Sequence, residues 1–272
     1  MQKKLYIGTN TKMYKTIRQT VAFLDELGSL TRDIDRNLLE LFVIPSYTAL
    51  DAAARTAQAQ AITLGAQNMS WEDEGQFTGE VSPLMLEETG VRLVCIGHSE
   101  RRHIFGEDDE VENKKVLAAL RHHFTPLLCV GETASQKELG IQNEVLRSQL
   151  KVGLHDTSPE QARHIWIAYE PVWAIGVGGT PAGVMYASRM HTVIRQTLRE
   201  IYGGEAGDRI PILYGGSVNN MNARELIQAP DIDGLFIGRS AWDADNFSRI
   251  IHDLMDICSI KKNGGDFYEK KD

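Results

Sequence analysis

The sequence has few cysteines, no excess of positive charge and no long apolar run, and each absence argues against a class of protein. Its three cysteines, Cys95, Cys129 and Cys258, are odd in number and widely spaced. This pattern predicts reduced thiols in a cytoplasmic protein, and it argues against a disulfide framework or a zinc site. No apolar stretch approaches the ~20 residues that cross a membrane, and the N-terminus shows no secretory pattern. We therefore expect a cytoplasmic protein without a membrane partner.

Positive charge is outnumbered along the chain, which carries 29 Lys and Arg against 37 Asp and Glu, for a net charge of −8. Nucleic-acid-binding domains are usually basic, so a nucleic-acid partner is not expected. A small anionic substrate remains compatible with this charge, because main-chain N–H groups at a helix N-terminus can bind an anion locally.

Short apolar runs alternate with longer amphipathic stretches along the 272 residues, of which 42% are hydrophobic. Strands are predicted at 5–8, 41–44, 61–65, 93–96, 126–130, 165–169, 212–214 and 234–237. Helices are predicted at 19–30, 47–57, 109–122, 144–154, 183–202, 222–228 and 246–257. Strands that are mostly followed by helical sequence indicate parallel βαβ units.

Eight such units in roughly 250 residues fit a closed (β/α)8 barrel better than an open doubly wound sheet, which is the structural alternative. No linker rich in proline, glycine and serine divides the chain. We therefore predict an α/β fold with a single barrel domain at 1–257 and a polar tail at 258–272. In such barrels the chemistry lies at the C-terminal ends of the strands.

The strongest candidate for catalysis is Glu170, which follows the predicted strand 165–169 and precedes Pro171. A proline holds the residue before it in an extended conformation. The loop that follows has three glycines within residues 176–179, and glycines allow a backbone to move and to approach a ligand closely. A carboxylate at a strand end beneath such a loop indicates proton abstraction in a site that closes.

Asn10 and Lys12 follow the first predicted strand, and their two-residue spacing puts both side chains on one face of an extended segment. A lysine after a strand is most often a solvated loop residue. In a site, however, Lys12 would supply positive charge for an anionic substrate and for a developing enediolate. Asn10 would then orient the lysine or form a hydrogen bond with it.

His98 follows the fourth predicted strand and allows two interpretations. It is either a structural histidine bonded to backbone or an electrophile that polarises a carbonyl, kept neutral by the N–H groups of the helix that follows. Metal ligation is not expected, because no second Cys/His pair completes a zinc-like pattern.

A dense charge cluster follows His98 and contains Glu100, Arg101, Arg102 and Glu107. A solvated ion-pair surface is the default interpretation. In a barrel, Glu100 could instead lie beside Lys12. Glu132 could pair with an arginine of the same cluster.

Two glycine-containing turns follow the last two predicted strands, at 215–217 and 238–240. Each is an ordinary turn when taken alone. Together they occupy the place where many barrels bind phosphate on main-chain N–H groups. Gly176 could add a third N–H donor, and the guanidinium of Arg239 could make a bidentate contact.

Several of these segments together resemble the triosephosphate isomerase family. The resemblance extends over the chain to about residue 257 and rests on 168–178, 96–102 with 105–107, 214–218, and 65–68 with 77–80. These motifs are long, specific and in the family's order.

The resemblance implies roles for the candidate residues. Glu170 would be the base that moves a proton between adjacent carbons, and His98 would be the neutral electrophile. Lys12 and Asn10 would steady the substrate oxygens, with Glu100 beside them. The phosphate would be held by Gly176, Ser217, Gly238 and the backbone of Arg239.

The resemblance also implies closure of the loop 172–180, which would exclude water. No metal or organic cofactor is implied, and the partner would be a small phosphorylated sugar. It further implies a homodimer in which the loop 68–80, containing Phe77 and Thr78, reaches the partner's site near Asn10 and Lys12.

The chain departs from the family pattern at particular positions. Thr11 stands where the family has Trp, Val177 and Gly179 change the lid, and Arg239 and Trp242 replace Gly and Leu after the last strand. The Gly-Arg-Ser-Ala-Trp ending resembles paralogues that convert L-erythrulose 1-phosphate into D-erythrulose 4-phosphate. We therefore expect an isomerase of that tetrulose phosphate. An ordinary triosephosphate isomerase and a non-catalytic sugar-phosphate sensor are the alternatives, and the joint retention of Glu170, His98 and Lys12 argues against the sensor.

Overall fold

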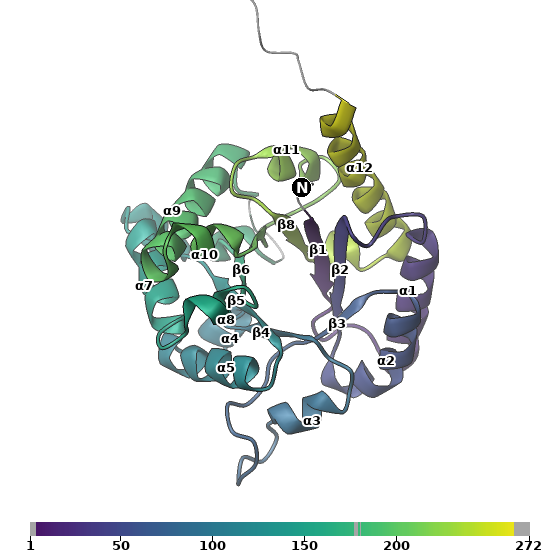
Figure 1. The fold of residues 1–272 in the computed structure, drawn as a ribbon, viewed down its shortest axis with the longest axis horizontal. Coiled ribbons are helices and arrows are strands. Elements are labelled where there is room, and N and C mark those ends of the chain that lie inside the picture. The colour runs from purple at the N-terminus through teal and green to yellow at the C-terminus, as the bar shows by residue number, and fades with distance from the viewer. Residues whose placement is uncertain (1–3, 177–178, 180, 264–272) are drawn as a thin grey trace, which may run out of the picture.

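The computed structural model describes residues 4–176, 179 and 181–263, with the side chains described as far as residue 255. Within them, eight parallel strands close into a barrel in sequence order (Figure 1). The strands are β1 (Leu5–Asn10), β2 (Leu39–Ile44), β3 (Thr63–Ala66), β4 (Leu93–Ile96), β5 (Thr125–Val130), β6 (Trp166–Tyr169), β7 (Ile212–Tyr214) and β8 (Gly234–Ile237). This confirms the predicted (β/α)8 barrel, and the open doubly wound sheet is wrong.

Helices surround the barrel as an outer ring (Figure 1). The α-helices are α1 (Ile17–Leu30), α2 (Leu50–Ala59), α3 (Pro83–Glu87), α4 (Ser99–His103), α5 (Asp109–Arg121), α6 (Ala134–Glu138), α7 (Gln142–Gly153), α8 (Pro159–Ala162), α9 (Val184–Tyr202), α10 (Gly204–Arg209), α11 (Ala223–Gln228) and α12 (Ala244–Asn263). Three short 3-10 helices are η1 (Tyr47–Ala49), η2 (Val172–Ala174) and η3 (Arg239–Ala241). Helix α12 continues past residue 257, the predicted end of the domain. Among the described residues, no helix is long and apolar enough to cross a membrane.

Several helices begin where the sequence supplies a capping side chain. Thr16 before α1, Thr133 before α6 and Ser158 before α8 each accept a hydrogen bond from a main-chain N–H in the first turn, and a glutamine reaches back in return. Such a cap stabilises a helix start by about 1 kcal/mol. These caps fix where the chain leaves a loop and enters the outer ring.

The strands separate two apolar layers. Residues such as Ile7, Leu41 and Val43 pack outward against the helices. The alternate residues fill the inside of the barrel with Phe42, Ile44, Leu93, Cys95, Leu127, Cys129, Ala168, Leu213 and Phe236. Because side chains fill the interior, the barrel is a packed core and not a pore. A ligand must therefore bind at an end of the barrel.

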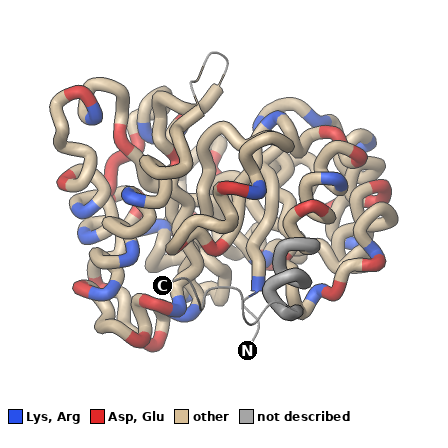
Figure 2. The backbone as a smooth tube through the Cα atoms, turned by 90° about the horizontal axis from the view of Figure 1, so that it is seen from above, with Lys and Arg blue, Asp and Glu red and all other residues tan. Residues whose placement is uncertain are grey.

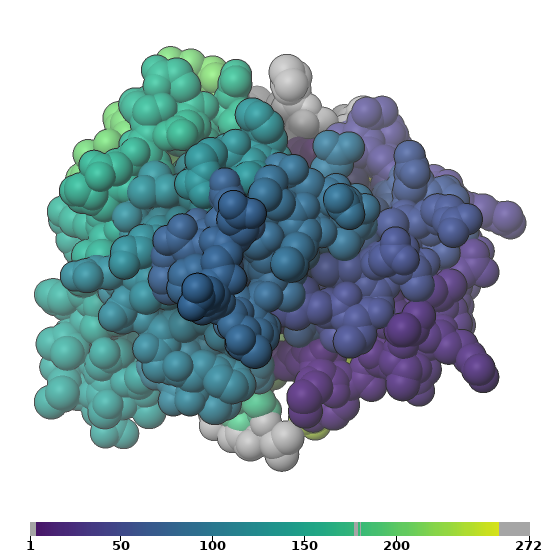
Figure 3. Space-filling view, turned by 90° about the horizontal axis from the view of Figure 1, so that it is seen from below, coloured from purple at the N-terminus to yellow at the C-terminus, as the bar shows by residue number. Residues whose placement is uncertain are grey.

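The segment between β3 and α3 extends beyond the ring of helices (Figure 1). Seen from that side, it stands out in dark blue near the centre of the molecule (Figure 3). Acidic and basic residues are interspersed along the outer helices in this view (Figure 2).

Candidate active site

A cavity of about 250 Å³ opens at the C-terminal ends of the strands. The residues that line it come from five strand ends and include Asn10 and Lys12 at the end of β1, His98 after β4, Glu170 and Gly176 after β6, Ser217 after β7, and Gly238, Arg239 and Trp242 after β8. The structure therefore brings most of the sequence-predicted site residues to one cavity. Glu100 lies beside this group through its contact with Lys12. Neither Phe77 nor Thr78 lines the cavity of its own chain.

Glu170 is held at the end of β6 by its main chain and is almost fully buried, at 3% exposure. Its Oε1 lies 3.4 Å from Nε2 of His98, and its Oε2 accepts a hydrogen bond from the N–H of Ser99 at 3.3 Å. Two glycines make room for it. A Cβ at Gly131 would come within 1.9 Å of the carbonyl oxygen of Glu170, and one at Gly215 within 2.9 Å of its Cγ.

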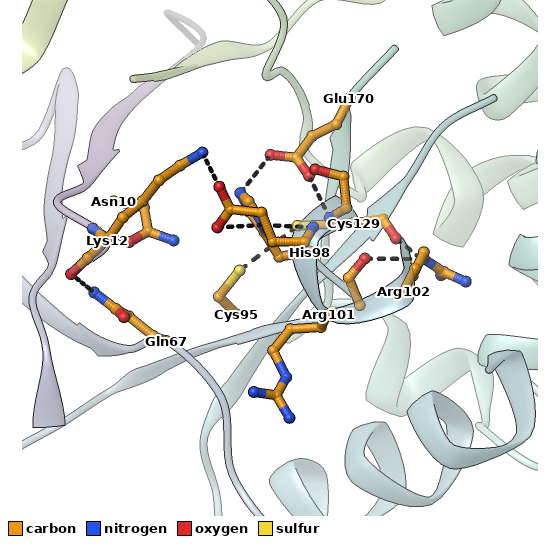
Figure 4. A network of polar contacts seen from close by, with 12 residues as sticks. Asn10, Lys12, Gln67, Cys95, His98, Arg101, Arg102, Cys129 and Glu170 are labelled. Atoms are coloured by element: carbon orange, nitrogen blue, oxygen red, sulfur yellow. Dashed lines mark hydrogen bonds and ion pairs between the residues drawn. The ribbon is translucent and has the colours of Figure 1, made fainter. Parts of the chain in front are cut away.

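His98 forms the N-cap of α4, and its Nδ1 accepts the N–H of Glu100 at 3.2 Å. An Nδ1 that accepts a hydrogen bond carries no proton, so this contact selects the tautomer with its proton on Nε2. That nitrogen faces Glu170 (Figure 4). The side chain can therefore present an N–H donor to a carbonyl oxygen placed in the cavity.

Lys12 has a left-handed backbone conformation with φ of 51°, which costs a non-glycine residue on the order of 1–3 kcal/mol. Three hydrogen bonds maintain this conformation. The N–H of Lys12 donates to Oδ1 of Asn10 at 2.7 Å, and Nε2 of Gln67 donates to the carbonyl oxygen of Lys12 at 2.8 Å. The ammonium group contacts Oε1 of Glu100 at 2.7 Å (Figure 4). Glu100 thus lies beside Lys12, as the sequence suggested.

Arg102 joins the loop after β4 to the end of β5. Its guanidinium donates to the carbonyl oxygens of Gly97 at 2.9 Å and Cys129 at 3.0 Å (Figure 4), and it also pairs with Asp109 and Glu112. Burial raises the pKa of Glu112 to about 8, while the charge of Arg102 opposes this shift. Arg102 therefore supports the strand end that carries His98.

The predicted pairing of Glu132 with an arginine is wrong. The buried carboxylate accepts hydrogen bonds from the hydroxyls of Tyr169 and Tyr186, at 3.0 and 2.9 Å, and from Nε1 of Trp173 at 2.8 Å. Burial and the charge of Glu132 together raise the pKa of both tyrosines. The physical reason is the register, in which Val130 lies opposite Tyr169, so the residues after β5 face β6 and not α4.

The loop after Glu170 begins with η2, in which Trp173 is the middle residue. Gly176 has a φ of 85°, in the left-handed region. A Cβ at Gly179 would come within 2.7 Å of the main chain of Ala174, which accounts for a glycine at that departure from the family lid. Val177 lies outside the described residues.

The two turns predicted to bind phosphate, at 215–217 and 238–240, both line the cavity. Ser217 follows Gly216, where a Cβ would come within 2.2 Å of the Tyr214 hydroxyl. Gly238 precedes η3, and a Cβ there would meet nothing within 4 Å. The side chain of Arg239 is exposed. Main-chain N–H groups at turns of this kind can receive an anion.

The projecting segment 68–80 is anchored at its two ends. The N–H of Ser70 donates to the carbonyl oxygen of Val81 at 2.8 Å, and Nζ of Lys115 donates to Oδ1 of Asn68 at 2.9 Å. Phe77 is 47% exposed near the middle of the segment. An exposed aromatic ring on an anchored loop is suited to contact another chain.

Within the described residues, no three His, Cys, Asp or Glu side chains are placed to share a metal ion. The expectation of a cofactor-independent reaction remains a prediction from the sequence.

Comparisons with known proteins agree on one family. Residues 5–254 match the family model described as triosephosphate isomerase. The chain is 46% identical over 249 residues to an L-erythrulose-1-phosphate isomerase of Rhizobium etli, with 91% of each chain covered. It is also 46% identical over 257 residues to a triosephosphate isomerase of a Roseiflexus species, with 93% of this chain and 98% of that one covered. The crystal structure of triosephosphate isomerase from Bartonella henselae matches with a TM-score of 0.83 at 33% identity, covering 93% of this chain and 99% of that one.

Proposed function

Because the chain belongs to the triosephosphate isomerase family and is therefore an isomerase, we propose that it converts L-erythrulose 1-phosphate into D-erythrulose 4-phosphate. The reaction class is the isomerisation of a phosphorylated sugar, and the specific substrate proposed within that class has four carbons. Membership of an enzyme family removes the reason for considering a non-catalytic sensor.

The reaction exchanges a ketone and a hydroxyl between adjacent carbons. L-Erythrulose 1-phosphate has its ketone at C2 and a hydroxyl at C3. Glu170 removes the proton from C3, the C–H electron pair forms a C2–C3 double bond, and the ketone oxygen becomes an enediolate oxygen. The proton of the C3 hydroxyl passes to the enediolate oxygen on C2, the oxygen on C3 becomes the new ketone as its C=O bond forms, and the carboxyl group of Glu170 returns its proton to C2. No net oxidation occurs, and numbering from the other end gives D-erythrulose 4-phosphate.

Two side chains are assigned to stabilise the developing oxygen charge. Nε2 of His98 carries the proton in the tautomer selected by the N–H of Glu100, so it can donate to the enediolate oxygen. The ammonium of Lys12 adds a positive charge at the same cavity. Preorganised donors of this kind often make the largest contribution to catalysis.

Glu170 must change partners before it can act as the base. Its carboxylate is hydrogen-bonded to Ser99 and lies 3.4 Å from His98. A substrate that enters between His98 and Glu170 replaces these contacts with the C–H bond to be broken. The loop after Pro171 lines the cavity with Ala174, Ile175 and Gly176 and is assigned to exclude water when it closes.

The substrate phosphate is assigned to the opposite side of the cavity. Gly176, Ser217, Gly238 and Arg239 line the cavity, and their main-chain N–H groups are assigned to the phosphate. The four-carbon substrate differs from the three-carbon ketose by one CH2OH group at the end away from the phosphate. Both substrates therefore use the same phosphate contacts, and the choice between them depends on the rest of the cavity.

The observation that carries the four-carbon assignment is the turn from Gly238 to Trp242, which supplies Arg239 and Trp242 to the cavity. Its sequence is the one that resembles the tetrulose-phosphate paralogues. Three relatives named L-erythrulose-1-phosphate isomerase, from Rhizobium etli, Rhizobium meliloti and Mesorhizobium japonicum, are 46%, 43% and 43% identical to the chain. Triosephosphate isomerase is the second candidate, because the Roseiflexus relative with that name is also 46% identical.

A comparison of kcat/KM on L-erythrulose 1-phosphate and on glyceraldehyde 3-phosphate tests the proposal. We expect at least a tenfold preference for the tetrulose, which corresponds to about 1.4 kcal/mol of transition-state binding. Glu170→Gln serves as the control for contaminating isomerases and should be inactive on both. A preference for the triose would overturn the four-carbon assignment and leave the isomerase class intact.

A homodimer and a cytoplasmic location complete the proposal. Exposed apolar side chains in two loops support the homodimer. Phe77 on the projecting segment is 47% exposed, and in the loop after β1 Met13 is 94% and Tyr14 67% exposed. Sedimentation of Phe77→Asp, which should shift the protein toward monomer, tests it against Leu139→Asp as an exposed apolar control on another loop. An unchanged sedimentation coefficient for Phe77→Asp would contradict the role of this loop. The cytoplasmic location rests on the cysteine pattern of the sequence, with Cys95 and Cys129 buried as free thiols.

A further inference from the structure

The loop that carries Lys12 is bound on both sides. On the side of β2, the N–H of Thr11 donates to the carbonyl oxygen of Ile44 at 3.1 Å. The β1–β2 pairing extends to Asn10 opposite Ile44, whereas the β1–β8 pairing ends one residue earlier, at Thr9 opposite Ile237. The carbonyl oxygen of Asn10 therefore extends beyond the β1–β8 ladder.

The indole of Trp242 binds this carbonyl oxygen. Its Nε1 donates to the main-chain oxygen of Asn10 at 2.9 Å. Its ring also lies 4.5 Å from the ring of Tyr14, at an angle of 38°. One side chain from the turn after β8 thus contacts the residue two before Lys12 and the residue two after it.

We propose that Trp242 is a positioning residue that fixes Lys12 through the main chain of Asn10 and the ring of Tyr14. Lys12 needs such support because its backbone is in the left-handed region, with φ of 51°. Asn10 has two tasks in this arrangement. Its side chain accepts the N–H of Lys12 at 2.7 Å, and its carbonyl oxygen is bound by the indole.

The same turn links the lysine loop to the phosphate side of the cavity. The N–H of Trp242 donates to the carbonyl oxygen of Arg239 at 3.1 Å, and both residues line the cavity. The turn that offers main-chain N–H groups to a phosphate therefore also sets the place of the lysine. A shift of this turn would move both substrate contacts together.

Two departures from the family pattern lie in the lysine loop and in the turn that contacts it. Where the family has Trp at position 11 and Leu at position 242, this chain has Thr11 and Trp242. Thr11 is 1% exposed, and the indole now contacts the loop from the turn after β8. In this chain an indole contacts the lysine loop from position 242, while position 11 carries a threonine.

The test removes the N–H of Trp242 and keeps an aromatic ring in contact with Tyr14. Trp242→Phe keeps an aromatic ring beside Tyr14 and removes the N–H that binds Asn10. We expect kcat/KM to fall about tenfold, the scale of one net hydrogen bond. Trp166→Phe is the matched control, because Trp166 begins β6 at the opposite end of the barrel and packs on Tyr6 and Phe42. It should leave kcat/KM unchanged.

A double-mutant cycle with Lys12→Met separates positioning from a general loss of structure. If Trp242 acts through Lys12, Trp242→Phe should lose most of its effect in the Lys12→Met background. Single-turnover measurements at high enzyme concentration keep the weak Lys12→Met activity measurable. A tenfold loss in both backgrounds, or no loss in the wild type, would overturn the inference.

This inference rests on the proposed role of Lys12 in substrate binding, and the cycle distinguishes the two failures. If Lys12→Met alone leaves activity unchanged, the role of Lys12 is wrong. If Lys12→Met is damaging and Trp242→Phe is neutral, only the positioning inference fails. Should Trp242→Phe not fold, Tyr14→Ala removes the ring contact from a side chain that is 67% exposed, and its sedimentation coefficient must match the wild type, because Tyr14 also belongs to the proposed dimer surface. The same dependence on Lys12 is expected, and an effect that is independent of Lys12 would overturn the inference.

Discussion

The indole N–H of Trp173 donates to the buried carboxylate of Glu132 at 2.8 Å, so the first turn of the lid is hydrogen-bonded to the loop after β5. The ammonium of Lys137 lies 3.4 Å from the centre of the same indole. The loop after β5 and helix α6 therefore hold Trp173 in its place. Any movement of the lid at this end must break or rearrange these contacts.

Trp173→Phe should loosen the lid without removing its aromatic ring. The phenyl ring still faces Lys137, but Glu132 loses one of its donors. We expect faster hydrogen exchange at the amides of Ala174 and Ile175, which are bonded within η2, and a loss of stability of about 1–3 kcal/mol. Hydrogen–deuterium exchange and urea unfolding measure the two effects.

Tyr186→Phe is the matched control, because it removes a donor from the same carboxylate but belongs to α9. It should lower stability to a similar extent and leave exchange in η2 nearly unchanged. Equal exchange rates in the two variants would show that the Trp173 bond does not restrain the lid.

Glu170→Asp should lower kcat at least a hundredfold with little change in KM. The shorter side chain withdraws the carboxylate by more than an ångström, and a misplacement of that size can cost about 100-fold. The phosphate contacts assigned to Ser217 and Gly238 are unaffected, so ground-state binding should persist. Steady-state kinetics measure both constants. An unchanged kcat would contradict the assignment of Glu170 as the base.

Arg239→Gly should raise KM for a phosphorylated substrate, or shift the preference toward the triose. The guanidinium is exposed at the cavity rim, so its contribution is electrostatic and screened by salt. The increase in KM should therefore shrink as ionic strength rises. Arg224→Ala, which removes an exposed arginine from α11, is the charge-matched control. If KM and the substrate ratio both stay the same, Arg239 has no part in binding.

The sequence predicted the barrel and the strand ends because these depend on local periodicity. All eight strands lie within a few residues of their predicted positions. The helices α3, α6, α8 and α10 were not predicted, since helices as short as these, of 4 to 6 residues, give little sign of a helical period. Glu170 could be found from the sequence because Pro171 and the glycines mark its position locally.

The contacts across the barrel could not be predicted in the same way. Gln67 and Trp242 support the Lys12 loop from β3 and from the turn after β8, and no local pattern gives the distance between those elements. The partner of Glu132 was predicted wrongly for the same reason, because the choice between α4 and β6 depends on strand register. The resemblance to a family supplied the order of the motifs but not these side-chain contacts.

Acid should destabilise the protein through His191, which is fully buried in α9. Its Nδ1 lies 3.0 Å from the carbonyl oxygen of Asp231, and the edge of its ring packs with Tyr169 at 5.6 Å. Burial lowers the pKa of His191 from 6.5 to about 4. The unfolded chain therefore binds a proton more readily than the folded one between these values. The stability that the neutral histidine contributes is complete above pH 6.5 and is lost as pH falls toward 4.

A depression of this size corresponds to about 3 kcal/mol of unfolding free energy across the window. His191→Phe removes the titrating group and keeps a ring beside Tyr169. The wild type should lose more stability than this variant between pH 6.5 and 4, as measured by urea unfolding at each pH. His155→Gln is the control, because His155 is exposed and its replacement should leave the wild-type slope in place. If His191→Phe shows the same slope as the wild type, the acid sensitivity has another origin.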